Sequence, residues 1–322
     1  SKRTVSRVIN GASNVGKATR ERIDEVIKET GFSPDKQARG LAASRSFLIG
    51  LIYDNPDALY IDQVQRGVLS VCSEKGYELV VHPCNYNTDD FISNCIQFVS
   101  RSRIDGVIIL PPVSEAKELA EALREKQINY VRMASVDLDD HSNIVVSDDR
   151  AALRDLARYM VSLGHRDIGI ISGPQRYYSS KERLEGFLET LNDLHVEVPS
   201  DRIIEGKNSY ESGIECARTL LIQSPRVKAI FANNDEMAAG VLKVAHEMGI
   251  TVPDELSVAG FDDNLLAARV IPALTTVQRP VGDMAALAAR KIIAQIEGTE
   301  VSETETYLVK PHLIIRDSIK RV

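Results

Sequence analysis

The sequence predicts an α/β protein of two lobes, each built on a doubly wound parallel β-sheet, preceded by an all-α head. From Phe47 onward, short β-rich runs alternate with amphipathic helical stretches, which is the pattern of parallel sheets covered by helices. About 275 residues follow Phe47, more than one such sheet usually needs, so two lobes are expected. The residues before Phe47 show only helical periodicity and form a separate head.

The head begins with a predicted helix over residues 2–10. Val5, Val8 and Ile9 follow i, i+3, i+4 spacing and form its apolar face. The opposite face is polar and contains Arg3, Ser6, Arg7 and Asn10. Gly11 ends the helix, because glycine readily adopts the left-handed conformation of a tight turn.

A second helix is predicted over residues 17–30, with Gly31 as its stop. Thr19 and two arginines lie near its beginning, where phosphate contacts are common. A Ser-Pro-Asp sequence at residues 33–35 then breaks the chain, and its aspartate can cap a third helix. That helix, over residues 36–43, would be marginal alone because helix nucleation is costly.

Charge divides the chain at the same point. Residues 1–47 contain ten Lys and Arg and five Asp and Glu, a net charge of +5. Because the whole chain has a net charge of −7, the remainder carries −12. A basic head on an acidic body is typical of a polyanion-binding module joined to another domain. A solvated basic helix would give the same count, so charge alone does not decide.

Composition excludes several classes of protein. No apolar run approaches the roughly 18–20 residues of a membrane span, and no signal peptide opens the sequence, so the expected location is cytoplasmic. The four cysteines show neither a CxxC pair nor metal-ligand spacing, so no metal is expected. The GxGxxG, P-loop, HExxH and GxSxG motifs are absent, and neither an enzyme nor a cofactor is predicted.

The body contains seven predicted strands and seven predicted helices. The strands are expected at residues 47–53, 77–82, 105–110, 128–134, 167–172, 227–232 and 256–261. The helices are expected at residues 62–75, 90–102, 114–126, 150–163, 180–193, 211–222 and 236–248.

Ligands of open parallel sheets bind outside the carboxyl ends of the strands, so the polar residues after each strand are candidates. These are Asp54, Asn55 and Tyr60; Ser179, Ser180 and Arg183; Asn233, Asn234 and Asp235; and Asp262, Asp263 and Asn264. Carboxylates, amides and an arginine around one cleft suit a polyhydroxylated neutral ligand.

Each candidate also has a simpler explanation. Asp235 is equally well explained as a helix N-cap, and Asn233 or Asp263 as a loop residue that satisfies backbone groups. Arg183 is equally consistent with a surface ion pair. His165 is better explained as a helix-end residue than as a ligand or catalyst.

An ordered series of segments resembles the LacI/GalR family of bacterial transcription repressors over essentially the whole chain. The head contains TVSRVINGASNV, TRERIDEVIKETGFSP and ARGLA, followed by FLIGLI. The body contains LGHRDIGIISGP, FANNDEMAAGVL, SVAGFDD and IPALTTVQRP. Each segment alone is a weak signal, and their order makes the resemblance strong.

The resemblance implies a helix-turn-helix head, a hinge helix and a two-lobed, periplasmic-binding-protein-like core. The expected boundaries are 1–33 for the head, 34–46 for the hinge, 47–147 with 280–308 for the N-terminal lobe, and 148–279 with 309–322 for the C-terminal lobe. The family usually has one further helix before the recognition helix, so we expect the first helix of the head to be missing from this sequence.

The resemblance also assigns DNA-binding roles. Lys2 and Arg3 match base-reading positions, and Arg7 matches an arginine that contacts the operator; arginine can pair bidentately with guanine. The other expected DNA-binding residues are the phosphate-contacting Ser6 and Thr19, Asn10 on the recognition helix, Ala38 in the hinge, and Leu41 as the leucine that wedges into the minor groove.

In the core, six residues match positions that line the family's effector cleft: Tyr60, Arg183, Asn208, Asn234, Asp262 and Arg279. Asp54 and Ser179 complete the expected effector set from their places after strands. Arg279 and Arg132 stand where the family seldom has arginine, and two extra cleft arginines would favour a sugar acid or sugar phosphate. Two departures in the head, Gly16 for a serine cap and Asp35 for asparagine, are minor.

The predicted function is a sequence-specific DNA-binding transcription regulator, a repressor of carbohydrate-metabolism genes. It is expected to work as a homodimer on operator DNA, under the control of a small sugar-like effector bound between the two core lobes. The alternatives are a sugar-binding protein of a transport system and a Rossmann-type enzyme. The basic head and absent signal peptide argue against the first, and the missing dinucleotide fingerprint against the second. The effector, the operator, the sign of the response and the choice between dimer and tetramer stay open.

Overall fold

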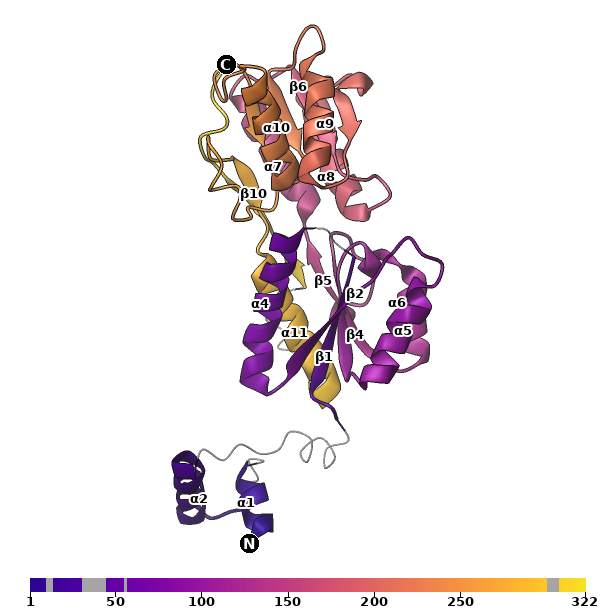
Figure 1. Cartoon of the computed structure of the whole chain (residues 1–322), viewed down its shortest axis with the longest axis vertical. Coiled ribbons are helices and arrows are strands. Elements are labelled where there is room, and N and C mark those ends of the chain that lie inside the picture. Colours follow the sequence, from indigo (N-terminus) through magenta and orange to yellow (C-terminus); the bar gives the residue numbers. More distant parts are fainter. Residues whose placement is uncertain (10–13, 31–44, 55–56, 300–306) are drawn as a thin grey trace. The chain divides into compact units, whose positions relative to one another are not determined.

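A computed structural model describes residues 1–9, 14–30, 45–54, 57–299 and 307–322. The chain divides into two units, Ser1–Phe47 and Leu48–Val322 (Figure 1). Most of the predicted hinge, including Ala38 and Leu41, lies outside the described residues, as does Asn10.

The described residues of the first unit include the helices α1 (Lys2–Ile9) and α2 (Lys17–Thr30), as predicted. The helices contact each other, and Val8 on the apolar face of α1 is buried. Arg3 and Arg7 of α1 and Thr19 of α2 are exposed. Lys2 and Ser6 belong to α1 by their backbone. This unit therefore presents at least three of the predicted DNA-contacting side chains to solvent.

The described residues of the second unit form two large parallel sheets and one small antiparallel pair of strands. The first large sheet has six strands in the order β11-β5-β4-β3-β1-β2, with every neighbouring pair parallel. The strands are β1 (Leu48–Tyr53), β2 (Glu78–Pro83), β3 (Gly106–Ile109), β4 (Asn129–Ala134), β5 (Ile144–Ser147) and β11 (Leu308–Val309). One face is covered by α4 (Ala58–Lys75) and α11 (Val281–Glu297), and the other by α5 (Phe91–Ser102) and α6 (Lys117–Glu125) (Figure 1). We call this sheet with its helices the N-terminal lobe.

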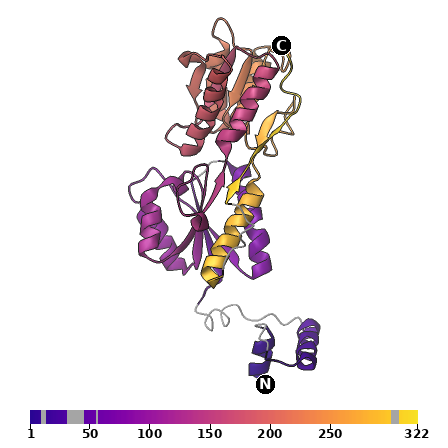
Figure 2. The same cartoon turned by 180° about the vertical axis from the view of Figure 1, so that it is seen from behind.

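The second sheet has four parallel strands in the order β7-β6-β8-β9. They are β6 (Ile168–Ser172), β7 (Ile203–Glu205), β8 (Ala229–Ala232) and β9 (Ser257–Ala259). The helices α7 (Asp149–Ser162) and α8 (Tyr178–Asp193) cover one face, and α9 (Tyr210–Leu221) and α10 (Asp235–Glu247) the other (Figure 2). We call this sheet, its helices and the antiparallel pair β10 (Thr276–Gln278) and β12 (His312–Ile314) the C-terminal lobe.

Each lobe is held together by apolar side chains that alternate along its strands. In β8, Ile230 and Ala232 face α9 and α10, while Ala229 and Phe231 face α7 and α8. The chain passes between the lobes after β5, between β10 and α11, and between β11 and β12. The cleft between the lobes is therefore bordered by connecting segments that belong to neither sheet.

The seven predicted strands are all present, with bounds that differ from the predicted ones by at most two residues. The seven predicted body helices are also confirmed, although α4 begins four residues earlier than expected. The predictions omitted α11 and the strands β5, β7, β10, β11 and β12. These strands contain only two to four residues each, too few for a periodic pattern to stand out.

Candidate functional site

A cavity of about 460 Å³ lies between the two lobes, at the carboxyl ends of their parallel strands. The N-terminal lobe contributes loops after β1, β2 and β3, and the C-terminal lobe contributes loops after β6, β7, β8 and β9. All eight residues predicted for the cleft line this cavity: Asp54, Tyr60, Ser179, Arg183, Asn208, Asn234, Asp262 and Arg279. The fold thus brings together residues separated by more than 200 positions in the sequence.

Arg183 lies at the centre of the site and is buried, so the simpler interpretation of a surface ion pair is wrong. Its Nε donates to Asp149 Oδ2 at 2.9 Å, and its Nη1 donates to the backbone oxygen of Asn233 at 2.8 Å. Its Nη2 lies 3.6 Å from Asp262 Oδ1. The guanidinium also stacks on Phe261, 3.7 Å from the ring centroid. These contacts fix the orientation of a planar donor group at the cavity wall.

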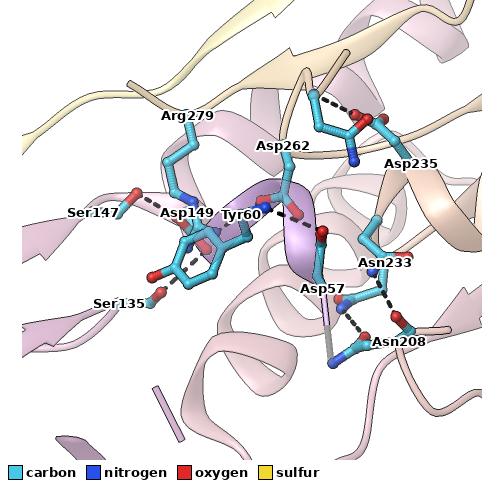
Figure 3. A network of polar contacts seen from close by, with 12 residues as sticks. Asp57, Tyr60, Ser135, Ser147, Asp149, Asn208, Asn233, Asp235, Asp262 and Arg279 are labelled. Atoms are coloured by element: carbon cyan, nitrogen blue, oxygen red, sulfur yellow. Dashed lines mark hydrogen bonds and ion pairs between the residues drawn. The ribbon is translucent and has the colours of Figure 1, made fainter. Parts of the chain in front are cut away.

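Asp149 is the residue that connects Arg183 to the other lobe, and it was missed from the sequence. Its carboxylate accepts hydrogen bonds from Ser147 at the end of β5 and from Ser135 Oγ, at 3.1 Å, just after β4 (Figure 3). Asp149 is completely buried and does not line the cavity. It follows β5, and because that short strand was not predicted, the residues after it were not considered.

Arg279 continues the same network. Its Nη2 donates to Asp262 Oδ1 at 2.9 Å, and its guanidinium lies 4.9 Å from the ring centroid of Tyr60. Burial alone would lower the pKa of Arg279, but Asp262 and the other nearby acidic groups raise it above its ordinary value. In the alternating series Asp149, Arg183, Asp262 and Arg279, two carboxylates face two guanidiniums. Arg279 is therefore not an unmatched cation.

The backbone of Asp262 is also unusual. Its φ of 104° lies in the left-handed region, which is uncommon for a residue other than glycine. Such strain is stored at ligand sites where surrounding contacts hold the conformation, and here Asp262 N donates to Val277 O at 2.9 Å and its carboxylate meets Arg279.

Three asparagines form a second polar cluster in the cavity wall. Asn233 Nδ2 donates to Asn208 Oδ1 at 2.9 Å, and Asn234 Nδ2 donates to Asn208 O at 3.0 Å (Figure 3). Asn234 Oδ1 accepts from Met237 N at 3.0 Å and so caps α10. Asn233 consequently contacts a side chain of the cleft instead of only satisfying loop backbone.

The N-cap interpretation of Asp235 is wrong, because Asn234 is the cap and Asp235 is the first residue of α10. The buried Asp235 carboxylate accepts from Thr276 Oγ1 at 2.6 Å and from Asn264 N at 3.0 Å. Burial raises the pKa of Asp235 well above its ordinary value, and Thr276 opposes that rise. Neither Asp235 nor Asp263, which accepts from Gln278 Nε2 at 2.7 Å, lines the cavity.

The N-terminal lobe contributes two carboxylates to the cavity. Asp54 accepts from Tyr86 N at 2.8 Å. Asp57, which the sequence analysis missed, caps α4 by accepting from Leu59 N at 2.9 Å and Tyr60 N at 3.1 Å. Burial, followed by repulsion from Asp262, raises the pKa of Asp57. Its position just before a helix was the signal that would have identified it.

Arg132 does not belong to the cleft, contrary to the expectation of two extra cleft arginines. Its Nε donates to Ser114 O at 2.6 Å, and its Nη1 donates to Leu138 O at 3.0 Å and pairs with Asp139 at 3.2 Å. The side chain is buried inside the N-terminal lobe because β4 turns it away from the cavity, towards these acceptors.

His165 follows the end of α7, as predicted for a helix-end residue, and its Nε2 lies 2.9 Å from the backbone oxygen of Lys320. The described residues include no cluster of three or more His, Cys, Asp or Glu side chains suited to a metal ion. Over the same described residues, no helix has both the length and the apolar character of a membrane span.

Two family models match the chain. The model for bacterial regulatory proteins of the lacI family matches residues 1–35, and the model for a periplasmic binding protein-like domain matches residues 157–319. The HTH-type transcriptional repressor PurR of Salmonella paratyphi B is 31% identical over 322 residues, which cover 98% of this chain and 92% of that protein.

Solved structures of the same kind are similar along the whole chain. A complex of the transcriptional regulator CelR with cellobiose has a TM-score of 0.76 and 28% identity, covering 99% of this chain and 96% of that one. A lac repressor dimer bound to operator and the anti-inducer ONPF has a TM-score of 0.81 and 25% identity, with the same coverage. With a helical head, two parallel-sheet lobes and these full-length similarities, the chain belongs to the LacI family of bacterial regulatory proteins.

Proposed function

We propose that this protein is a sequence-specific DNA-binding transcription regulator, a repressor of carbohydrate-metabolism genes, controlled by a small sugar-like effector bound between the two core lobes. The observation that supports this most directly is the combination, in one chain, of a basic helical unit of the lacI type with a cleft lined by paired charges and amides. DNA binding would place the protein with the chromosome, in the cytoplasm.

The proposed DNA-binding surface is the polar face of α1 together with the start of α2. Arg3 and Arg7 would read bases or contact the operator, and Thr19 would contact phosphate, since all three side chains are exposed. Lys2 and Ser6 share α1 with them. For Asn10, Ala38 and Leu41 the proposal rests on the family resemblance. The lac repressor structure is a dimer on its operator, which supports a homodimer acting on a pseudo-palindrome.

The cleft chemistry suits a polyhydroxylated effector. A sugar hydroxyl both donates and accepts, and here the carboxylate of Asp262 lies beside the guanidinium groups of Arg183 and Arg279. The Nε of Arg279 is buried and has no hydrogen-bond partner among the described residues, so an acceptor from a ligand would satisfy it. The CelR complex contains cellobiose, which supports a sugar in this place.

The charge balance of the cleft favours a neutral sugar over a sugar phosphate. Because the two central arginines are matched by Asp149 and Asp262, no unmatched cation faces the centre of the cavity among the described residues. A sugar acid or a sugar phosphate would have to place its anionic group near the exposed side chains of Arg176 or Lys207, which also line the cavity.

The proposal is tested in two steps. The protein is incubated with random DNA duplexes to select a binding consensus, and its melting temperature is measured with cellobiose, neutral hexoses, hexuronates and hexose 6-phosphates. Any stabilising sugar is then tested for release or retention of the selected duplex. We expect a palindromic consensus and a response to a neutral sugar. Absence of a consensus, together with sugar binding, would favour the sugar-transport alternative.

A further inference from the structure

The first backbone amides of α8 donate their hydrogen bonds to a residue of the opposite lobe. The N-cap residue Tyr177 supplies no side-chain bond within the described residues, whereas α7, α9 and α10 are capped by their own Asp148, Ser209 and Asn234. Instead, the carboxylate of Glu115 accepts from Tyr178 N at 3.0 Å and from Ser179 N at 3.4 Å. A carboxylate is favoured there because the helix N-terminus has unsatisfied amides and a positive dipole end.

Glu115 is held rigidly in the N-terminal lobe. It ends a short 3₁₀ helix, Val113–Glu115, that follows β3. Ser114 Oγ in that turn donates to Met133 O of β4 at 2.7 Å, and Arg132 Nε of the same strand donates back to Ser114 O at 2.6 Å. Arg132, which has no place in the cavity, therefore braces the turn that carries Glu115. Burial raises the pKa of Glu115, while the two amides, Arg132 and Lys181 counteract that rise.

The contact joins two walls of the cleft. Ser179, whose backbone amide is one of the two that donate to Glu115, lines the cavity. Arg183 follows one turn later on α8. A second contact between the lobes lies nearby, where the rings of Tyr86 and Tyr177 meet edge to face with centroids 6.4 Å apart. Any movement that separates the lobes here must break the Glu115 bonds and move α8 relative to Tyr86.

We propose that Glu115 is a positioning residue that latches the two lobes across the cleft by capping α8, and so sets the balance between its closed and open forms. Only one consequence of this inference rests on the proposed function, namely its effect on the affinity for the effector. A ligand enclosed by the lobes binds more tightly when a larger fraction of the protein is closed. The latch itself is a property of the protein without ligand or DNA.

The test uses amide exchange and one fluorescent reporter in the full chain, with no ligand and no DNA added. The chain has no tryptophan, so Tyr86→Trp provides a single tryptophan beside Tyr177, whose emission can be excited apart from that of the tyrosines. In Glu115→Ala the amides of Tyr178 and Ser179 should exchange about tenfold faster, the ratio expected for loss of a helix cap. The amide of Ala151 donates to the side chain of Asp148, the N-cap of α7, and its exchange rate should not change. Emission of Trp at position 86 should shift to the red and become easier to quench with acrylamide.

Glu118→Ala is the matched control. It also removes one negative charge, from an exposed side chain of α6 that lies three residues after Glu115 in the sequence. It should leave amide exchange and acrylamide quenching unchanged. Because Glu118, like Glu115, acts electrostatically on Tyr86, this variant also shows how far the emission shifts from the loss of a nearby charge alone. Glu115→Gln keeps one acceptor oxygen, so its effects should be intermediate, and it replaces the alanine variant should that one not fold.

Faster exchange with unchanged quenching would show a local cap that does not hold the lobes, and would overturn the proposal. Unchanged exchange, or equal effects of Glu118→Ala, would overturn it as well. The proposed function is tested by DNA selection and sugar screening, and the latch by amide exchange and fluorescence quenching. Either proposal can therefore fail while the other stands.

Discussion

Replacing Arg183 by methionine tests the buried charge network and its link to the effector response. The Arg183 side chain is 6% exposed, and its Nε donates to Asp149, whose side chain is fully buried. Methionine has a similar length but no charge, so Asp149 would keep only its hydrogen bonds from Ser135 and Ser147. Removing one partner of a buried pair costs about 3–5 kcal/mol, and Asp262 is spared the same loss because Arg279 remains beside it.

The expected result is a folded but less stable protein. Against a total stability of roughly 5–15 kcal/mol, and with about 2–4 °C lost per kcal/mol, the melting temperature should fall by about 10 °C. Urea unfolding at 25 °C, followed by circular dichroism, measures the loss directly. The double variant Asp149→Asn/Arg183→Met removes both charges, and its loss should be smaller than the sum of the two single losses by about 1–3 kcal/mol.

Two results would refute this reasoning. A loss below about 1 kcal/mol for Arg183→Met would mean that Asp149 does not depend on its cation. Strictly additive single and double losses would mean that the two residues are not coupled. If the double variant folds, it also isolates function: a sugar that stabilises the original protein should no longer change its affinity for the selected duplex.

Three further predictions concern pH, salt and the hinge. Burial raises the pKa of Asp235 above 3.8, so the folded protein retains a proton that the unfolded chain releases. The contribution of Asp235 to the free energy of unfolding is therefore complete at low pH and declines as pH rises towards the folded pKa. Asp235→Asn should make the free energy of unfolding, measured by urea titration, depend less on pH. An unaltered pH dependence would show that Asp235 is ionised when folded. Affinity for the selected duplex should fall steeply with salt in anisotropy titrations, and a flat dependence would argue against phosphate contacts. Arg3→Ala should relax the preference for the selected sequence, because Arg3 is expected to read bases. Leu41→Ala should weaken duplex binding while sugar affinity stays the same, and unchanged duplex affinity would remove the proposed wedge role.

Local patterns in the sequence were sufficient for the longer strands and for most helices of the fold. Alternation of β-rich runs with amphipathic helices predicted parallel sheets, because the buried face of a helix and the continuous apolar character of a buried strand are written in consecutive residues. The rule that ligands lie beyond the carboxyl ends of parallel strands led to Arg183, Asn234 and Asp262, all of which line the cavity. For these residues, sequence position and spatial position are linked directly by the topology.

Contacts between residues far apart in the sequence were decided only by the tertiary structure. Arg183 binds Asp149, 34 residues away, and Glu115 caps a helix 63 residues further along the chain. Arg132 has the charge of a cleft residue but is turned inward to Ser114 and Asp139. Whether a charged side chain lines a cavity, matches another charge or braces a turn depends on which distant residues surround it, and no local periodicity records those neighbours. The sequence by itself determined a basic helical head, two sheet lobes and the residues at their strand ends, whereas folding determined which charges cancel and which one joins the lobes.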